Sequence, residues 1–199
     1  MKYRLYIEGG GNSASESAQF RKAWSEFFRK AGLSGKLPSI VRGGGRNRTF
    51  DQFKTAVANP KKNELPLLLV DSETAVAAEH SVWQHLGSKD NWDQPTGTDD
   101  RQAFLMVQVM ETYFVADRSS LKRFFGSDFN ADRIPQWPNL ETIPKETVFN
   151  ALADATRECI TPYRKGKLSF ELLAQVNPKI VANACPHAKD LLDTLKKRK

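Results

Sequence analysis

The fold of this chain is decided by one stretch, Leu65-Pro66-Leu67-Leu68-Leu69-Val70-Asp71-Ser72-Glu73. Residues 67–70 are four consecutive apolar side chains without polar alternation, which is typical of a strand buried on both faces. Strands of this kind belong to parallel sheets that are covered by helices. The stretch therefore predicts an α/β protein, and it places two carboxylates directly after a buried strand.

Further apolar runs extend this pattern along the chain. The first is Lys2-Tyr3-Arg4-Leu5-Tyr6-Ile7-Glu8, which ends in an acid, and we expect shorter strands at residues 38–41 and 104–109. Apolar side chains at helical spacing predict helices between the first three strands, at residues 18–31 and 49–58. The alternation of strands and helices predicts a mostly parallel central sheet flanked by helices.

The second half of the chain reads as mainly helical. Helices are expected at residues 74–86 and 144–160, and a helical tail at 170–176, 180–184 and 188–195, whereas residues 87–100 form a polar loop. We therefore expect an α/β core over residues 1–117 and a helical C-terminal extension over residues 118–199. The two parts are expected to pack as a single compact unit.

Composition narrows the class of protein. The 199 residues are 40% hydrophobic and 27% charged, and no run approaches the roughly 20 apolar residues that a membrane span needs. The charged start does not resemble a signal peptide, and the two cysteines lack metal-type spacing. These features predict a cytoplasmic protein with no membrane partner, and the net charge of +7 favours polyanions such as nucleic acid.

The acids at the strand ends form the strongest candidate site. Ligands of open parallel sheets bind outside the carboxyl ends of the strands, where we expect Glu8 and Asp71 to meet. Glu73 lies two residues after Asp71, so an extended backbone would turn both side chains the same way. Three crowded carboxylates repel unless a cation neutralises them, which predicts a Mg²⁺ or Mn²⁺ site.

Two later acids are interpreted differently. Glu111 lies among apolar residues, so it is expected to be either a buried ion partner or a further residue of the catalytic site. Asp117 is expected to end a turn or cap a helix.

Each of two glycine clusters could either bind phosphate or serve as an ordinary turn or loop. Gly9, Gly10 and Gly11 follow a strand and precede a helix, which suits either a turn that cradles a phosphate or a plain tight turn. In the second cluster, residues 42–46 are expected to form a turn, and three arginines surround its glycines: Arg42, Arg46 and Arg48. They would either hold a phosphate backbone through their guanidinium groups or form a solvated basic loop. Lys145, Lys165 and Lys167 could likewise contact phosphates, although single lysines are usually solvated.

The acidic pattern resembles the Toprim domain of topoisomerases, primases and overcoming-lysogenization-defect (OLD) nucleases. That pattern is a Glu followed by Gly and then an Asp-x-Asp pair, in which Glu73 replaces the second Asp here. Nearly the whole chain is similar to a bacterial Toprim-like family of unknown function, through Tyr6-Ile7-Glu8-Gly9-Gly10-Gly11, Val70-Asp71-Ser72-Glu73, Leu105-Met106-Val107-Gln108-Val109-Met110-Glu111-Thr112-Tyr113 and Tyr163-Arg164-Lys165-Gly166.

The resemblance implies a divalent-metal-dependent nuclease that hydrolyses phosphodiester bonds of DNA or RNA. Such proteins are often encoded beside an ABC- or AAA-type ATPase in phage-defence or abortive-infection operons, where the Toprim member acts as the effector. Carried over to this chain, Glu8 is the first acid, and Asp71 and Glu73 are the pair that binds Mg²⁺ or Mn²⁺. The alternative is a toxin-like or regulatory partner of an ATPase that has a degenerate, non-catalytic site.

Overall fold

Four parallel strands form the centre of the structure, a computed structural model that describes residues 1–9 and 14–197. They lie in the order β2-β1-β3-β4 and span Lys2–Glu8 (β1), Ser39–Gly44 (β2), Glu64–Asp71 (β3) and Ala103–Met106 (β4). The chain leaves β1 toward β2 on one side and then crosses to β3 on the other. The switch point, where ligands of such sheets bind, therefore lies between β1 and β3.

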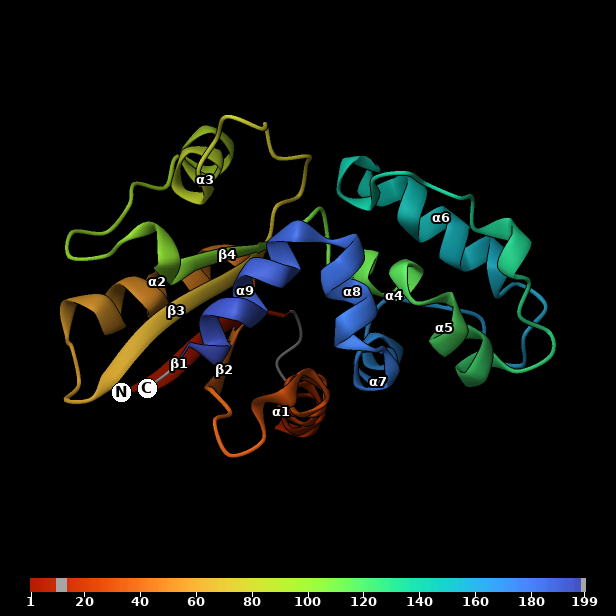
Figure 1. Ribbon diagram of the computed structural model, residues 1–199, viewed down its shortest axis with the longest axis horizontal. Helices are drawn as coiled ribbons and strands as arrows, with labels where there is room; N and C mark the ends of the chain where they lie inside the picture. Colours follow the sequence, from red (N-terminus) through yellow and green to blue (C-terminus); the bar gives the residue numbers. More distant parts are fainter. Residues whose placement is uncertain (10–13, 198–199) are drawn as a thin grey trace.

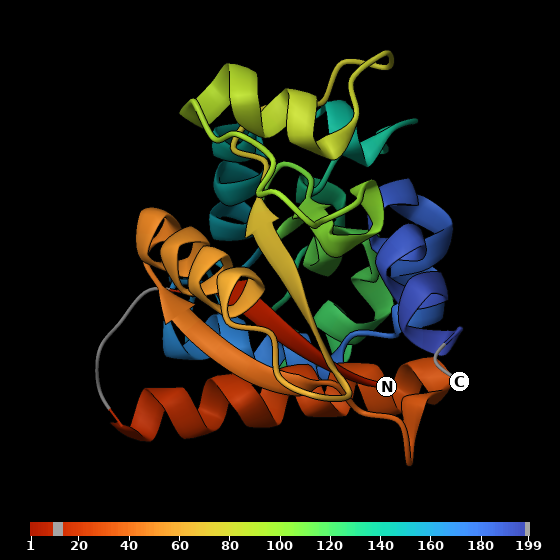
Figure 2. The same ribbon diagram turned by 90° about the vertical axis from the view of Figure 1, so that its left-hand side faces the viewer.

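Helices cover both faces of the sheet and continue into a helical C-terminal region (Figures 1 and 2). The helices are α1 (Ala14–Phe28), α2 (Arg46–Ala58), α3 (Val82–Asp90), α4 (Thr112–Ala116), α5 (Arg118–Phe125), α6 (Lys145–Ala155), α7 (Lys167–Gln175), α8 (Pro178–Ala184) and α9 (Pro186–Lys196). Short helical turns lie at Arg29–Leu33, Asp100–Gln102, Ala131–Arg133 and Leu140–Thr142. The α/β fold with a parallel sheet and C-terminal helices is the one that the sequence predicts.

Side-chain alternation along the strands divides the core in two. Leu5, Ile7 and Leu69 face α1 and the C-terminal helices, whereas Tyr6 and Leu68 face the aromatic side chains of α2 and α3. Because all these side chains are at most 7% exposed, both faces of the sheet are covered. The expectation of a buried parallel sheet is confirmed.

Several predicted boundaries are wrong. Residues 74–86 were expected to be one helix, but α3 begins only at Val82, where Ser81 and Gln84 form a reciprocal cap. Most of residues 74–79 are exposed; Val76 packs against the core, but one such contact does not supply the apolar face that stabilises a helix. Likewise α6 ends at Ala155 rather than at residue 160.

The segments around the carboxyl ends of the strands also differ from expectation. β4 ends at Met106 instead of residue 109, because the backbone of residues 108–110 turns to bond Asp71 at the end of β3 and Glu73 just after it. The expected turn at residues 42–46 is shorter, since β2 runs to Gly44 and α2 begins at Arg46. Both differences lie at the rim of the sheet where the candidate site is found.

Candidate functional site

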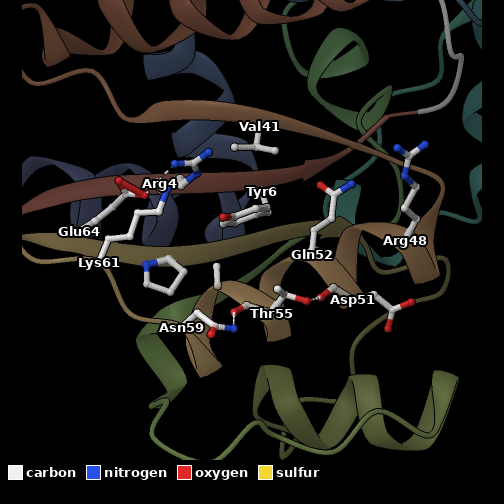
Figure 3. Close-up of a pocket in the computed structure, with 12 residues that line it drawn as sticks. Arg4, Tyr6, Val41, Arg48, Asp51, Gln52, Thr55, Asn59, Lys61 and Glu64 are labelled. Carbon is white, nitrogen blue, oxygen red and sulfur yellow. Dashed lines mark hydrogen bonds and ion pairs between the residues drawn. The ribbon is translucent and has the colours of Figure 1, made fainter.

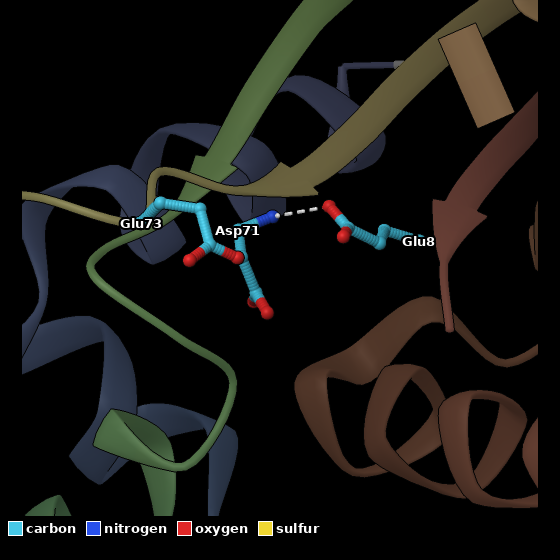
Figure 4. A group of neighbouring side chains, drawn as sticks. All are labelled: Glu8, Asp71 and Glu73. Carbon is cyan, nitrogen blue, oxygen red and sulfur yellow. Dashed lines mark hydrogen bonds between the residues drawn. The ribbon is translucent and has the colours of Figure 1, made fainter. Parts of the chain in front are cut away.

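Three carboxylates gather at the switch point between β1 and β3 (Figure 4). Glu8 ends β1, Asp71 ends β3, and Glu73 follows two residues later. One carboxylate oxygen of each residue lies within 4.8 Å of those of the other two. The three acids therefore meet at one rim of the sheet, as their positions after buried strands predict.

The backbone brings Glu73 to this rim by a route that the sequence did not indicate. We expected an extended backbone after Asp71, but Glu73 adopts a left-handed conformation with φ of 65°. The turn is held by two bonds to the segment after β4, from the Ser72 amide to the Met106 carbonyl (3.0 Å) and from the Glu73 amide to the Gln108 carbonyl (2.9 Å). A left-handed residue other than glycine costs free energy, so these bonds fix a conformation that the chain would otherwise avoid.

Asp71 is the most buried of the three acids, with 8% of its surface exposed. The amide of Met110 donates to its Oδ1 at 3.0 Å. Burial, reinforced by the nearby charges of Glu8 and Glu111, raises the pKa of Asp71 well above its ordinary value, and Lys165 opposes this only in part. Asp71 is thus a carboxylate at which added positive charge would be strongly favoured.

Glu8 is held from two sides. Its Oε2 accepts hydrogen bonds from the Asp71 amide (3.2 Å) and from Nη1 of Arg46 (3.1 Å). Burial raises the pKa of Glu8, while Arg46 and the Asp71 amide act in the opposite direction. The side chain is therefore fixed in place with one oxygen engaged.

Two cations from helix starts balance the acids. Arg46, the first residue of α2, forms a bidentate pair with Asp90 (2.8 and 2.6 Å) and also donates to Glu8 and to the Asp71 carbonyl. Lys145, the first residue of α6, pairs with Glu73. Sequence reasoning missed Asp90 and the pairing of Lys145 with Glu73, because the partners are distant in the chain.

Glu111 lies behind the three acids and is completely buried. Its Oε1 accepts from the hydroxyls of Tyr163 (2.8 Å) and Ser169 (3.4 Å), whereas its Oε2 has no hydrogen-bond partner in the described part of the chain. Burial, followed by the charge of Glu111, raises the pKa of Tyr163, so the phenol stays protonated and donates. Among the described residues, hydroxyl groups bond this carboxylate and no ion pair to it is found, so its contacts do not form the expected buried ion pair. A role in the catalytic site stays a prediction.

A cavity of about 300 Å³ joins Glu111 to the acidic rim. Its lining includes Glu8, Asp71, Glu111 and Lys165, together with the apolar side chains of Phe20, Met106, Met110 and Phe170. Asp117 lies outside this lining and caps α5 through the Ser120 amide (3.1 Å), which confirms its expected role as a helix cap.

Gly9 is explained by packing rather than by phosphate binding. Its amide donates to the Gly44 carbonyl at 2.9 Å, so this group is used by the sheet. A Cβ atom at Gly9 would lie 2.4 Å from the ring of Phe20, which only glycine avoids. Of the two interpretations, the tight turn fits Gly9; Gly10 and Gly11 lie outside the described residues.

The three arginines of the second glycine cluster enter three different environments. The Arg42 side chain is 5% exposed and bonds the Gly9 carbonyl (3.2 Å) and the Ser17 hydroxyl (3.1 Å). Arg46 binds the acids described above. Arg48 is exposed and lines a separate cavity of about 470 Å³ between α2 and the sheet (Figure 3). The expected common phosphate-binding loop is therefore not formed by these side chains.

The structure thus defines an α/β protein with a parallel sheet and three carboxylates at its rim. The comparisons with known proteins add its family. A family model described as "Domain of unknown function (DUF4276)" matches residues 7–196, so the chain belongs to this family. No curated protein and no solved structure matches the chain. Within the described residues, no helix is long and apolar enough to cross a membrane.

Proposed function

We propose that this protein is a divalent-metal-dependent nuclease whose centre is formed by Glu8, Asp71 and Glu73. The observation that carries the proposal is the approach of the three carboxylates to within 4.8 Å at the switch point of a parallel sheet. Carboxylate oxygens are the donors that Mg²⁺ and Mn²⁺ prefer, and Asp71, whose pKa is raised by burial and by the charges of Glu8 and Glu111, would be stabilised by such a cation. The donor set therefore fits such a cation.

The roles of the residues follow from their surroundings. Asp71 and Glu73 would hold Mg²⁺ or Mn²⁺, and a bound cation would supply Lewis-acid stabilisation of phosphate charge and an activated water. Glu8 is held beside Asp71 and would act as a further ligand or as a general base. Lys145 and Lys165 lie next to these acids and would offset charge on the phosphate.

The biological setting in this proposal rests on the resemblance to Toprim-like proteins. It comprises a cytoplasmic location, a nucleic-acid substrate, an ABC- or AAA-type ATPase partner, and an effector role in anti-phage or abortive-infection defence. A second function, a non-catalytic partner of such an ATPase, is favoured by one observation. Lys145 and Arg46 already pair with Glu73 and Glu8, which is how a degenerate site would balance its acids.

Nuclease assays separate these two functions. DNA and tRNA would be incubated with Mg²⁺ or Mn²⁺ and the wild-type protein, Glu8→Gln, Asp71→Asn, or the control Asp93→Asn, whose side chain is exposed. The proposal predicts metal-dependent cleavage by wild type and control, and a loss of at least roughly 100-fold in both site variants, as is usual when one catalytic group is removed. Full activity of both site variants would reject these acids as the catalytic centre, and no cleavage by any protein would favour the non-catalytic function.

A further inference from the structure

The net positive charge of the chain is concentrated in its C-terminal part. Residues 118–199 contain 15 Lys and Arg against 9 Asp and Glu, whereas residues 1–117 contain 15 against 14. The part that carries the acidic rim is therefore nearly neutral, and the helical part is basic. A polyanion would be attracted to the helical part.

One segment of the helical part brings this charge to the acidic rim. We call residues 163–169, which end the connection from α6 and form the first turn of α7, the basic loop. Its ends, Tyr163 and Ser169, are buried, whereas Arg164, Lys165 and Lys167 between them are exposed. Three cations thus project from a short segment whose two ends are fixed in the core.

Glu111 fixes both ends of the basic loop. Its Oε1 accepts from Tyr163 at 2.8 Å and from Ser169 at 3.4 Å, and these two hydroxyls lie 2.9 Å apart. The Gly166 amide donates to the Ser169 hydroxyl at 3.2 Å, with Gly166 at φ of 134°, a conformation for which glycine is needed. The buried carboxylate of Glu111 therefore ties both ends of the loop to the core, and the Tyr163 amide adds a bond to the Thr156 hydroxyl at 2.8 Å.

The basic loop lies next to the candidate metal centre. Lys165 and Gly166 line the same cavity of about 300 Å³ as Glu8, Asp71 and Glu111. The Nζ of Lys165 lies 5.1 Å from the centre of the Phe149 ring, which limits the positions of this cation. A phosphate at the acidic rim would therefore have exposed positive charge beside it.

We propose that the basic loop binds the sugar–phosphate backbone of the nucleic-acid substrate beside the acids, and that Glu111 is the positioning residue that holds the loop there. This inference rests on the proposed nuclease function. It assigns backbone binding to Arg164, Lys165 and Lys167 rather than to Arg42 and Arg46, whose side chains are engaged within the protein. Non-specific contacts to phosphates are made in this way by exposed lysine and arginine.

Binding to a labelled single-stranded oligonucleotide in EDTA, over a range of salt concentrations, tests the loop without any hydrolysis. The triple variant Arg164→Ala/Lys165→Ala/Lys167→Ala should lower the slope of log K against log salt by about 2, since each phosphate contact of a single strand contributes about 0.7. Its affinity at low salt should fall roughly 10- to 100-fold. The matched control removes three exposed lysines near the opposite end of the sheet, Lys2, Lys61 and Lys62, and should leave both values unchanged within about twofold.

Variants of Glu111 and its partners test the positioning role. Glu111→Gln keeps an oxygen that accepts from Tyr163 and should retain oligonucleotide affinity, whereas Glu111→Ala and Tyr163→Phe should weaken binding several-fold. Tyr113→Phe is the control, because its buried hydroxyl has no hydrogen-bond partner among the described residues, and it should bind as wild type does. Unfolding curves would confirm that each variant is folded.

The outcomes separate the inference from the proposed function. Equal loss of affinity in the two triple variants, no loss in the basic-loop variant, or no binding by wild type would overturn the inference, whatever the nuclease assays give. Loss of binding by Glu111→Gln equal to that by Glu111→Ala would overturn the positioning role. Loop-dependent binding by a protein that cleaves nothing would leave the inference in place and reject the nuclease.

Discussion

Replacing Asp71 by Asn should stabilise the metal-free protein at neutral and alkaline pH. Two unit charges 4.8 Å apart, the outer limit for the nearest oxygens of these acids, repel by about 3.5 kcal/mol at an effective dielectric constant of 20. Asp71 faces Glu8, Glu73 and Glu111, and Lys165 offsets part of this repulsion. Asn keeps an oxygen for the Met110 amide, so we expect a net gain of about 1–3 kcal/mol in the free energy of unfolding.

The stability difference between Asp71→Asn and wild type should depend on pH in a definite direction. The pKa of Asp71 is raised in the folded protein, so the native state binds a proton that the unfolded state has already lost. Wild-type stability therefore falls as the pH rises from the unfolded pKa of about 3.9 through the higher folded value. Because Asn does not titrate, the advantage of Asp71→Asn should be small near pH 4 and full above the folded pKa.

Urea unfolding in EDTA at several pH values measures this effect. The control is Asp93→Asn, which removes an exposed carboxylate and should change the free energy of unfolding by less than about 0.5 kcal/mol. The reasoning is refuted if Asp71→Asn is less stable than wild type at alkaline pH, or if its advantage does not vary with pH.

Two further predictions concern the ion pairs. Arg46→Met leaves Glu8 and Asp90 without their shared cation, so it should lower the free energy of unfolding by about 3 kcal/mol in urea; a loss below about 1 kcal/mol would show that the pairs contribute little. The pKa of His187 is raised by its hydrogen bond to Glu141, so this contact stabilises the protein below the unfolded pKa of about 6.5 and is lost as the pH rises through the folded value. His187→Gln should therefore cost more stability at pH 6 than at pH 9, and equal losses would contradict this assignment.

The sheet could be predicted from the sequence because each strand is an apolar run bounded by turns. Residues 67–70 have no polar alternation, and this alone indicates a strand covered on both faces. The ends of elements were less predictable. Residues 74–81 have helix-forming side chains, but most of them are exposed and only Val76 among them packs against the apolar core, which does not make a buried helix face. β4 stops where the following backbone bonds to the Asp71 turn.

The candidate site was predictable only where it lies at strand ends. Glu8 and Asp71 could be placed together because parallel strands end at the same edge. The left-handed turn at Glu73 and the pairing of Glu73 with Lys145, 72 residues later in the chain, depend on tertiary contacts that no local pattern encodes. The arginines near β2 looked like a phosphate loop because sequence spacing does not reveal which side chains are already engaged.

Direct titration of Mn²⁺, followed by electron paramagnetic resonance, tests the central claim that the three acids form a metal centre. Wild type and Asp93→Asn should bind Mn²⁺ saturably below millimolar concentration, and Asp71→Asn should lose this binding. Equal binding by wild type and Asp71→Asn, or no binding by wild type at millimolar Mn²⁺, would contradict the account.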